Sequence, residues 1–227
     1  YETSGLTWHQ GLEKIFTVSD EGILSMMNRD GTELVHWNLG GDFEAVTVAD
    51  YESNFIYIGV ESPDSVIEFD VSTGQITRTF SLTNWMTGPS NLGLEALTFV
   101  PDATHPEGGL FYAGLQSTGE VFRFDLSVKS SSTVTSVTFI DTLTIEGNHT
   151  DIADLSYDPS SDRILAVYDS LDRIKVIEKD GELRTQWVAP GSEQEAILYV
   201  GGDLFIGEDF GSSSTGTITR YSPFTSI

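Results

Sequence analysis

The sequence predicts an all-β protein made of five similar units. A short segment recurs five times, reading SGLTW at 4–8, EAVTV at 44–48, EALTF at 95–99, ADLSY at 153–157 and EAILY at 195–199. After each copy come β-rich runs separated by turns rich in Gly, Asp, Asn and Ser, and no stretch has the length and periodicity of a helix. Four antiparallel strands per unit, repeated radially, form a β-propeller, so we expect five blades. A β-sandwich, the alternative, has no reason to repeat in this way.

The expected strands follow one another in the same order in each unit. Their ranges are 4–9, 14–19, 22–28 and 33–39 in the first unit; 43–49, 54–60, 65–70 and 75–82 in the second; 94–100, 109–115, 120–126 and 134–143 in the third; 152–158, 163–168, 173–178 and 182–188 in the fourth; and 195–200, 203–207 and 216–221 in the fifth. Gly31, Gly74 and Gly181 lie in turns between third and fourth strands, where glycine supplies the positive φ that tight hairpins need.

We expect one domain over residues 1–227, because a single all-β domain of this length is ordinary. The blades are expected at about 1–40, 41–90, 91–147, 148–190 and 191–227. In the last of these only 223–227 remains for a fourth strand, so we expect either a three-stranded blade or completion by flanking sequence. The stretches 83–93, 102–108 and 129–133 are expected to be loops, with Trp85 in the first of them folded over a blade.

Acidic residues dominate the charge of the chain. There are 35 Asp and Glu against 11 Lys and Arg, which gives a net charge of −24. This charge argues against nucleic acid and anionic membrane surfaces as partners, because both repel it. The chain contains no Cys, which excludes disulfides and thiolate metal sites, and no apolar run approaches the roughly 18 residues of a membrane span. We expect an extracellular, periplasmic or cell-surface location.

Acidic side chains recur at the start of the repeated segments. The segments align on an apolar residue, namely Leu6, Val46, Leu97, Leu155 and Ile197. Two positions earlier stand Ser4, Glu44, Glu95, Ala153 and Glu195, and four positions earlier stand Glu2, Asp42, Gly93, Asp151 and Glu193. In the fourth unit Asp154 follows the alanine, and it is the candidate cation ligand of that unit. Because these segments are expected to line the propeller axis, Glu44, Glu95 and Glu195 form a predicted inner ring.

A second set of polar residues ends the second strand of each unit. It consists of Asp20, Glu61, Gln116, Asp169 and Glu208. Antiparallel neighbours bring the start of one strand beside the end of the next, so this outer ring is expected at the same mouth of the channel as the inner ring. Crowded carboxylates take up protons or hold a cation. Oxygen ligands in this number favour Ca²⁺ over Mg²⁺, and the alternatives are a water-filled acidic pore and capping of strand ends.

Other motifs carry less chemistry. His9, His36, His105 and His149 lack the spacing of a metal site, and the sequence contains neither a phosphate-binding glycine loop nor a G-x-S-x-G elbow. Asn148 begins an Asn-His-Thr glycosylation sequon. Asp64 and Asp172 are expected to be turn residues.

Several of these segments are typical of one family. The openings ETSGLTW at 2–8 and NLGLEALTF at 91–99, the FTVSDE segment at 16–21 and DIADLSYDP at 151–159 resemble the SdiA-regulated β-propeller family. The NLGLEAL pattern also resembles the esterase-like phytase group. The small residue after each inner-ring Glu is Ala here, where the family often has Gly. The resemblance implies a propeller with an acidic, calcium-binding axial site.

Two functions fit these patterns. The first is a calcium-binding propeller that acts as a binding or structural module, with a protein, a glycan or a small molecule as its partner at the channel mouth. The second is a metal-dependent hydrolase of lactonase or phosphoesterase type, with Asp20 or Glu208 as general base. A phosphate substrate is disfavoured, because Arg and Lys fall mainly on third and fourth strands. Glycan hydrolysis by a carboxylate pair is a third possibility. The catalytic residues stay unassigned.

Overall fold

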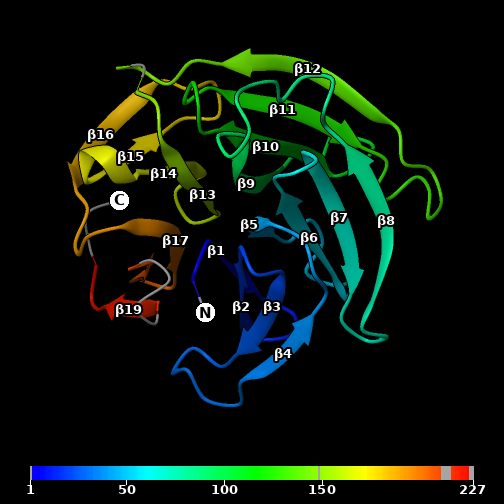
Figure 1. Ribbon diagram of the computed structural model, residues 1–227, viewed down its shortest axis with the longest axis horizontal. Helices are drawn as coiled ribbons and strands as arrows, with labels where there is room; N and C mark the ends of the chain where they lie inside the picture. The colour runs from blue at the N-terminus through cyan, green and yellow to red at the C-terminus, as the bar shows by residue number, and fades with distance from the viewer. Residues whose placement is uncertain (1, 148, 211–215, 225–227) are drawn as a thin grey trace.

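The computed structural model describes residues 2–147, 149–210 and 216–224, which form five antiparallel sheets arranged in a ring (Figure 1). Four of the sheets have four strands and the fifth has three. The innermost strands are β1 (Gly5–His9), β5 (Phe43–Thr47), β9 (Leu94–Pro101), β13 (Ile152–Asp158) and β17 (Gln194–Val200). They coincide with the five repeated segments, so the prediction of a five-bladed β-propeller is confirmed.

Within each blade the strands follow the chain from the axis to the rim. The outer strands are β2 (Lys14–Ser19), β3 (Ile23–Met27) and β4 (Val35–Asn38) in blade 1; β6 (Phe55–Val60), β7 (Ser65–Asp70) and β8 (Gln75–Ser81) in blade 2; β10 (Gly109–Leu115), β11 (Val121–Leu126) and β12 (Val137–Leu143) in blade 3; β14 (Arg163–Tyr168), β15 (Arg173–Ile177) and β16 (Leu183–Val188) in blade 4; and β18 (Asp203–Glu208) and β19 (Thr217–Tyr221) in blade 5. A short 3-10 turn, η1 (Asp169–Leu171), follows β14. Within the described ranges no helix has the length and apolar character to cross a membrane.

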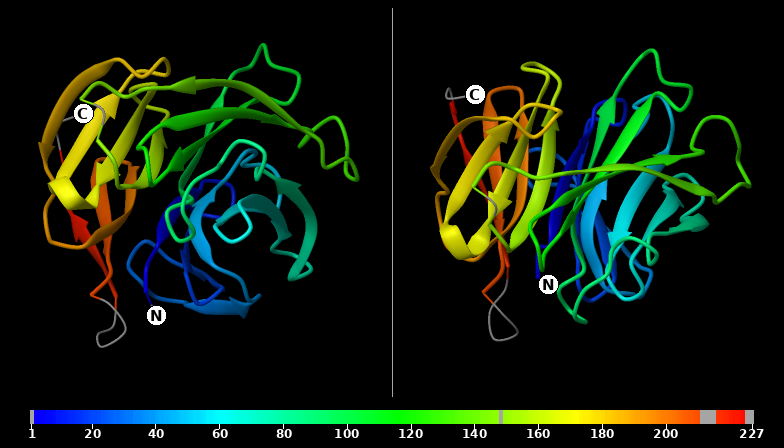
Figure 2. Two further views of the ribbon diagram at one scale, coloured as in Figure 1. Left: turned by 45° about the horizontal axis from the view of Figure 1, so that its top comes forward. Right: turned by 90° about the horizontal axis from the view of Figure 1, so that it is seen from above.

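Each blade turns one edge, its innermost strand, toward the axis (Figure 2). The core lies between the facing sheets of neighbouring blades. The five aligned apolar residues are all buried there, each at most 1% exposed, as the repeat predicts: Leu6, Val46, Leu97, Leu155 and Ile197. Each packs toward the preceding blade, as when Val46 of blade 2 joins Phe16 and Val18 of blade 1. Contact of β1 with both β5 and β17 closes the ring.

Small residues allow the blades to approach closely near the axis. The alanine after each inner-ring Glu lies opposite a glycine of the second strand, as in the pair Ala45 and Gly59. A Cβ on Gly59 would lie 2.4 Å from Cδ2 of Leu94 in the next blade. Ala96 and Gly114 form the same pair in blade 3, where a Cβ on the glycine would lie 2.8 Å from that of Ala96. Glycine is therefore needed at these positions for packing rather than for a turn.

Hydroxyl groups join consecutive innermost strands. The residue after the aligned apolar position accepts a hydrogen bond from a backbone N–H of the next blade. The pairs are Phe99 N with Thr47 Oγ1 at 3.0 Å, Tyr157 N with Thr98 Oγ1 at 3.1 Å and Tyr199 N with Ser156 Oγ at 3.5 Å. The Thr or Ser of the repeated segment thus has a structural role in three blades.

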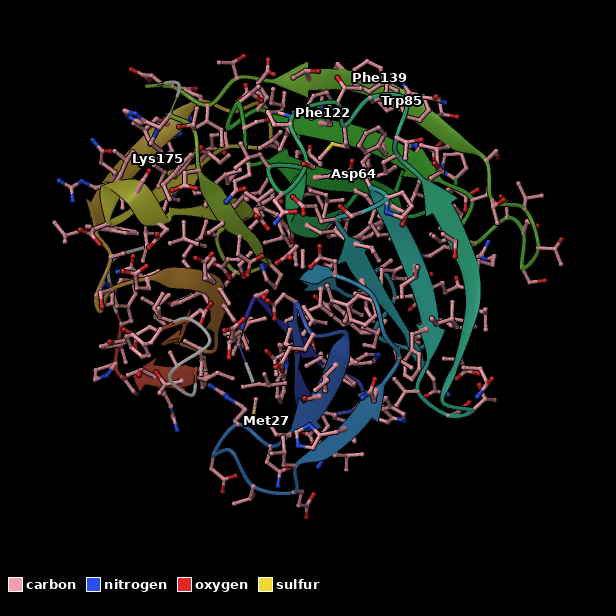
Figure 3. All side chains as sticks on the ribbon, viewed as in Figure 1. Met27, Asp64, Trp85, Phe122, Phe139 and Lys175 are labelled. Carbon is pink, nitrogen blue, oxygen red and sulfur yellow. The ribbon has the colours of Figure 1, made fainter. Side chains whose placement is uncertain are left out.

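Among the described residues, the third strand of blade 5 is its last. In the other blades the third strand is covered by a fourth, whereas β19 has no fully buried residue. A cleft of about 1020 Å³ separates blade 5 from blade 1, and its apolar lining includes Ile15, Met27, Phe205 and Ile218 (Figure 3, where Met27 is labelled). The three-stranded alternative is therefore confirmed for the described residues, while 225–227 lies outside them.

The loop that contains Trp85 folds back onto blade 3. Its indole lies 5.6 Å from the Phe124 ring and 6.2 Å from the Phe139 ring, between centroids, and Met86 is buried (Figure 3). The loop prediction for 83–93 is confirmed.

At the rim, Arg78 of β8 pairs with Glu68 and donates to the backbone oxygens of Ser127 and Ser131, which holds the segment between β11 and β12 beside β8 (Figure 1).

Candidate functional site: the acidic axial mouth

A β-bulge marks the inner-ring position in four blades. The strand pairing skips one residue of the innermost strand between Phe43 and Ala45, between Leu94 and Ala96, between Ile152 and Asp154, and between Gln194 and Ala196. The skipped residues are Glu44, Glu95, Ala153 and Glu195. A bulge leaves one residue out of the ladder and redirects its side chain. The repeat therefore places a bulge in four blades and a carboxylate on it in three.

The inner-ring glutamates of blades 2 and 5 act electrostatically on the inner-ring glutamate of blade 3. Burial, together with the negative charges of Glu44 and Glu195, raises the pKa of Glu95 well above its usual value. Burial and the charge of Asp42 raise the pKa of Glu44 to about 9, and burial and the charge of Asp169 raise the pKa of Glu195 to about 8. The side chains of Glu44 in blade 2 and Glu195 in blade 5 are thus near enough to Glu95 in blade 3 for their charges to affect it.

The cationic side chains of the described residues make their ion pairs elsewhere. Arg78 pairs with Glu68, Arg123 pairs with Asp141, and Arg29 pairs with Asp203. None of the ion pairs found in 2–147, 149–210 and 216–224 includes Glu44, Glu95 or Glu195. Among the described residues the inner ring consequently has no ion-paired cation to balance its charge.

Asp154 differs from the other candidates because it is fully buried. Its Oδ2 accepts hydrogen bonds from the N–H groups of Ile197 at 2.9 Å and Leu6 at 3.4 Å, and its Oδ1 accepts one from Leu155 at 2.8 Å. Burial raises its pKa, against the effect of these three donors. The carboxyl group joins the innermost strands of blades 4, 5 and 1, so its role is to fasten the ring.

Outer-ring carboxylates hold strand ends. Glu61 Oε1 accepts a hydrogen bond from Gly93 N at 2.7 Å, and Asp169 Oδ1 accepts one from Gln194 N at 2.9 Å, each in the following blade. Glu208 Oε1 accepts one from Ser192 N at 3.0 Å. The alternative in which these acids cap strand ends is therefore seen in three of the five outer positions.

Two outer-ring oxygens are buried without a hydrogen-bond partner in the described chain. They are Oδ1 of Asp20 and Oε1 of Gln116. The carboxyl group of Asp20 also hydrogen-bonds Glu2, and this bond, with burial, raises the pKa of Glu2 to about 7. An unpartnered buried oxygen is costly, so these two atoms fit a site that a ligand completes.

Asp64 lies in a turn, as expected, and has a second role that the sequence did not predict. Asp64 Oδ1 accepts a hydrogen bond from Leu94 N at 2.8 Å, so this residue too fastens blade 3 to blade 2 (labelled in Figure 3). Asp151 also links separate segments. Its Oδ2 accepts a hydrogen bond from Ser170 N at 3.1 Å, and its Oδ1 accepts one from Gln116 Nε2 at 3.2 Å. The position of Asp151 in the repeat was a signal, whereas Asp64 has no counterpart in most blades.

The fit of this mouth to a cation depends on its donor set. Carboxylate and amide oxygens are the ligands of hard cations such as Ca²⁺, and the unpartnered Asp20 and Gln116 oxygens are of this kind. Within the described ranges no three acidic or His side chains stand in coordination geometry. The chemistry of these residues therefore fits Ca²⁺, whereas their present arrangement does not yet form a coordination site. Binding would require the carboxylate side chains to turn toward one point. Asn148, the sequon residue, lies outside the described residues.

Fold and site together define the class: a five-bladed β-propeller with an acidic axial mouth. A family model described as "Esterase-like activity of phytase" matches residues 3–167, which is more than half of the chain. The chain therefore belongs to this phytase-like family. The SdiA-regulated family model matches residues 130–210, in agreement with the resemblance in the repeated segments.

Solved structures of low sequence identity share the fold. A chain of the nidogen/laminin complex has a TM-score of 0.59 at 12% identity, with 97% of this chain and 76% of that chain covered. Hydrazine synthase from Kuenenia stuttgartiensis has a TM-score of 0.56 at 11% identity, with 94% of this chain covered. This chain spans 57% of the hydrazine synthase chain. No curated protein matches the sequence. At such identities the likeness concerns the fold alone.

Proposed function

We propose that this propeller binds Ca²⁺ at its acidic axial mouth and acts as a binding or structural module outside the cytoplasm. The observation that carries the proposal is the grouping of Glu44, Glu95 and Glu195 at one mouth without a compensating cation among the described residues. Like charges this close must be neutralised by protons or by a bound cation. At neutral pH a divalent ion bound between the three carboxylates would offset most of their charge and so reduce the repulsion among them.

The residues divide into ligands and supports. Glu44, Glu95 and Glu195 would supply the inner oxygens, with Asp20 Oδ1 and Gln116 Oε1 at the edge. Asp154, Glu61, Asp169 and Glu208 already accept backbone hydrogen bonds, so they position the strands that carry the ligands. Carboxylate ligands of this number match the coordination of Ca²⁺ better than the octahedral preference of Mg²⁺.

Calorimetric titration of Ca²⁺ tests the proposal. The wild type is expected to bind Ca²⁺ saturably and more tightly than Mg²⁺. Glu95→Gln is expected to weaken binding at least tenfold, whereas Glu52→Gln, at an exposed position away from the mouth, leaves it unchanged. Equal affinity in both variants would move the ion to another part of this acidic surface and reject the site.

A second candidate is hydrolysis of a neutral ester or lactone, which the description of the matched family supports. Bound Ca²⁺ would supply polarisation of the carbonyl oxygen. Asp20 is the better of the two expected bases, because Glu208 also faces hydroxyl donors at Thr217 and Thr219, 3.2 and 3.4 Å from its Oε2. The ion pairs that hold Arg29, Arg78 and Arg123 elsewhere disfavour a phosphorylated substrate.

Initial rates with p-nitrophenyl acetate and with phytate separate this candidate from the first. Turnover of the acetate that requires Ca²⁺ and falls at least tenfold in Asp20→Asn, but not in Asp180→Asn at an exposed turn, supports a hydrolase. Calcium binding without turnover of either substrate leaves the binding module as the function. Preferred release of phosphate from phytate would contradict the argument from charge.

A further inference from the structure

The channel end opposite the acidic mouth contains a cavity of about 510 Å³, which we call the aromatic cup. It is formed by the second halves of the repeated segments and by the residues that follow them, and its lining includes Leu6, Val46 and Leu155. None of the eight acidic candidates lines it. Four residues of strand, roughly 13 Å, separate the first position of a segment from the last. The cup is thus distinct from the acidic site.

Aromatic rings form the wall of the cup. Trp8, Tyr157 and Tyr199 are half-buried and come from three innermost strands, and Tyr51 is 38% exposed. The Tyr157 hydroxyl donates to Asp162 Oδ1 at 2.7 Å, and the Tyr199 hydroxyl donates to the backbone oxygen of Phe224 at 3.4 Å. These bonds fix the ring orientations from outside the cavity, so binding requires little ordering of the wall.

Buried residues with hydroxyl groups also line the cup. Thr47, Thr98 and Ser156 line it, and their oxygens accept the inter-blade hydrogen bonds from backbone N–H groups. A hydroxyl that accepts one bond still has its own O–H to donate. The cup therefore offers several donors from a rigid frame, arranged around the axis by the repeat.

The lining has almost no charge to offer a ligand. Asp158 is the charged residue among the lining residues, and no Lys, Arg or His accompanies it. Its carboxylate is occupied locally, since Oδ1 accepts from Ser160 N at 2.9 Å and Oδ2 from Ser161 Oγ at 2.7 Å. The lining thus offers no cation to an anionic ligand, and to a cationic ligand it offers one carboxylate that is already engaged in its own turn. The complementary ligand is neutral, with apolar faces for the rings and hydroxyl groups at its edge.

We propose that the aromatic cup binds a neutral pyranose ring, such as the terminal sugar of a glycan. A pyranose has two C–H faces that pack on aromatic rings and a rim of hydroxyls that meets the Thr and Ser donors. The cavity is within the range of 300–1,000 Å³ typical of small-ligand sites and has room for a monosaccharide with part of a second. This site does not depend on the calcium proposal, because the two mouths share no named residue.

Ligand-observed NMR and calorimetry with the methyl pyranosides of glucose, galactose, mannose and N-acetylglucosamine test the proposal. At least one is expected to bind saturably in the millimolar range or tighter, while glucose 6-phosphate binds at least tenfold more weakly than glucose. Tyr157→Leu and Trp8→Leu are each expected to weaken binding at least tenfold. Tyr221→Leu, on β19 and outside the cup, should leave it unchanged, and circular dichroism checks that all three variants are folded.

Ser156→Ala supplies a milder variant in case an aromatic substitution prevents folding, and a severalfold loss of affinity is expected from it. Binding unchanged by a calcium chelator and by Glu95→Gln would place the sugar in the cup rather than at the acidic mouth. The proposal is overturned if none of the four pyranosides binds, or if the cup variants bind them as the wild type does. It is also overturned if indole, an apolar probe, binds the cup more tightly than the sugar and yet displaces no sugar, because the sugar would then lie elsewhere.

Discussion

The side chains of Glu44 and Glu95 approach each other although they belong to the innermost strands of neighbouring blades, and burial together with the charge of Glu44 raises the pKa of Glu95. Each stands on a β-bulge, and burial raises the pKa of both. Such a contact requires a shared proton or a cation, since two bare carboxylates repel each other. Because the pair joins neighbouring blades, its protonation makes the stability of the ring depend on pH and on bound metal ions.

Without metal ions, the stability of the protein should fall as the pH rises from about 5 to about 9. The pKa of Glu44 is raised from 4.5 in the unfolded chain to about 9, and that of Glu195 to about 8. In this window the folded state binds more protons than the unfolded state, so the free energy of unfolding decreases with pH. Thermal melts in chelator across the window measure it. A melting temperature that stays flat or rises would contradict the raised pKa values, and Glu95→Gln should reduce the slope.

Asp154→Ala should destabilise the protein by about 3 kcal/mol or more, because three buried N–H groups lose their acceptor. Asp154→Asn keeps one carbonyl oxygen and should cost clearly less. Urea unfolding at constant pH gives both values. Equal losses for the two variants would mean that the negative charge, rather than the hydrogen bonds from Ile197, Leu6 and Leu155, matters here.

Leu97→Ala should cost roughly 2–5 kcal/mol, since its side chain is fully buried between blades 2 and 3. Ile140→Ala is the matched control, because Ile140 is 41% exposed on the outer strand of blade 3. Its cost should be under about 1 kcal/mol. Denaturant unfolding compares the two. Similar losses at both positions would contradict the packing described for the innermost strands.

The repeated segment was sufficient to predict the innermost strands, their buried residues and the convergence of Glu44, Glu95 and Glu195. Each repeated segment can be recognised from its own residues alone. Because the units repeat around one axis, equivalent residues of the segments lie at equivalent distances from that axis. The bulges were not predictable, because they depend on how each innermost strand pairs with its neighbour. They explain how a Glu next to a buried alanine can be left out of the strand pairing while the alanine stays in it.

The hydrogen bonds between blades could not be predicted from the sequence, for a different reason. Glu61 meets Gly93, and Asp169 meets Gln194, only after two blades have packed together. Asp64 resembles an ordinary turn residue until Leu94 is placed beside it. The aromatic cup had a signal in the Thr or Ser and aromatic pair that ends most repeated segments, yet its wall also needs Tyr51, which lies outside them.

The most direct test of the calcium-binding mouth is a pair of thermal melts at pH 7, one in chelator and one in millimolar Ca²⁺, for the wild type and for Glu95→Gln. An ion that binds only the folded state stabilises it by about 2.7 kcal/mol at a hundredfold excess over its dissociation constant. The wild type should therefore melt several degrees higher with Ca²⁺, and Glu95→Gln should lose most of this difference. Lowering the pH toward 5 should narrow it, because protons compete for the same oxygens. Identical melting of the wild type in chelator and in Ca²⁺ would contradict the site and leave an acidic pore that is neutralised by protons alone.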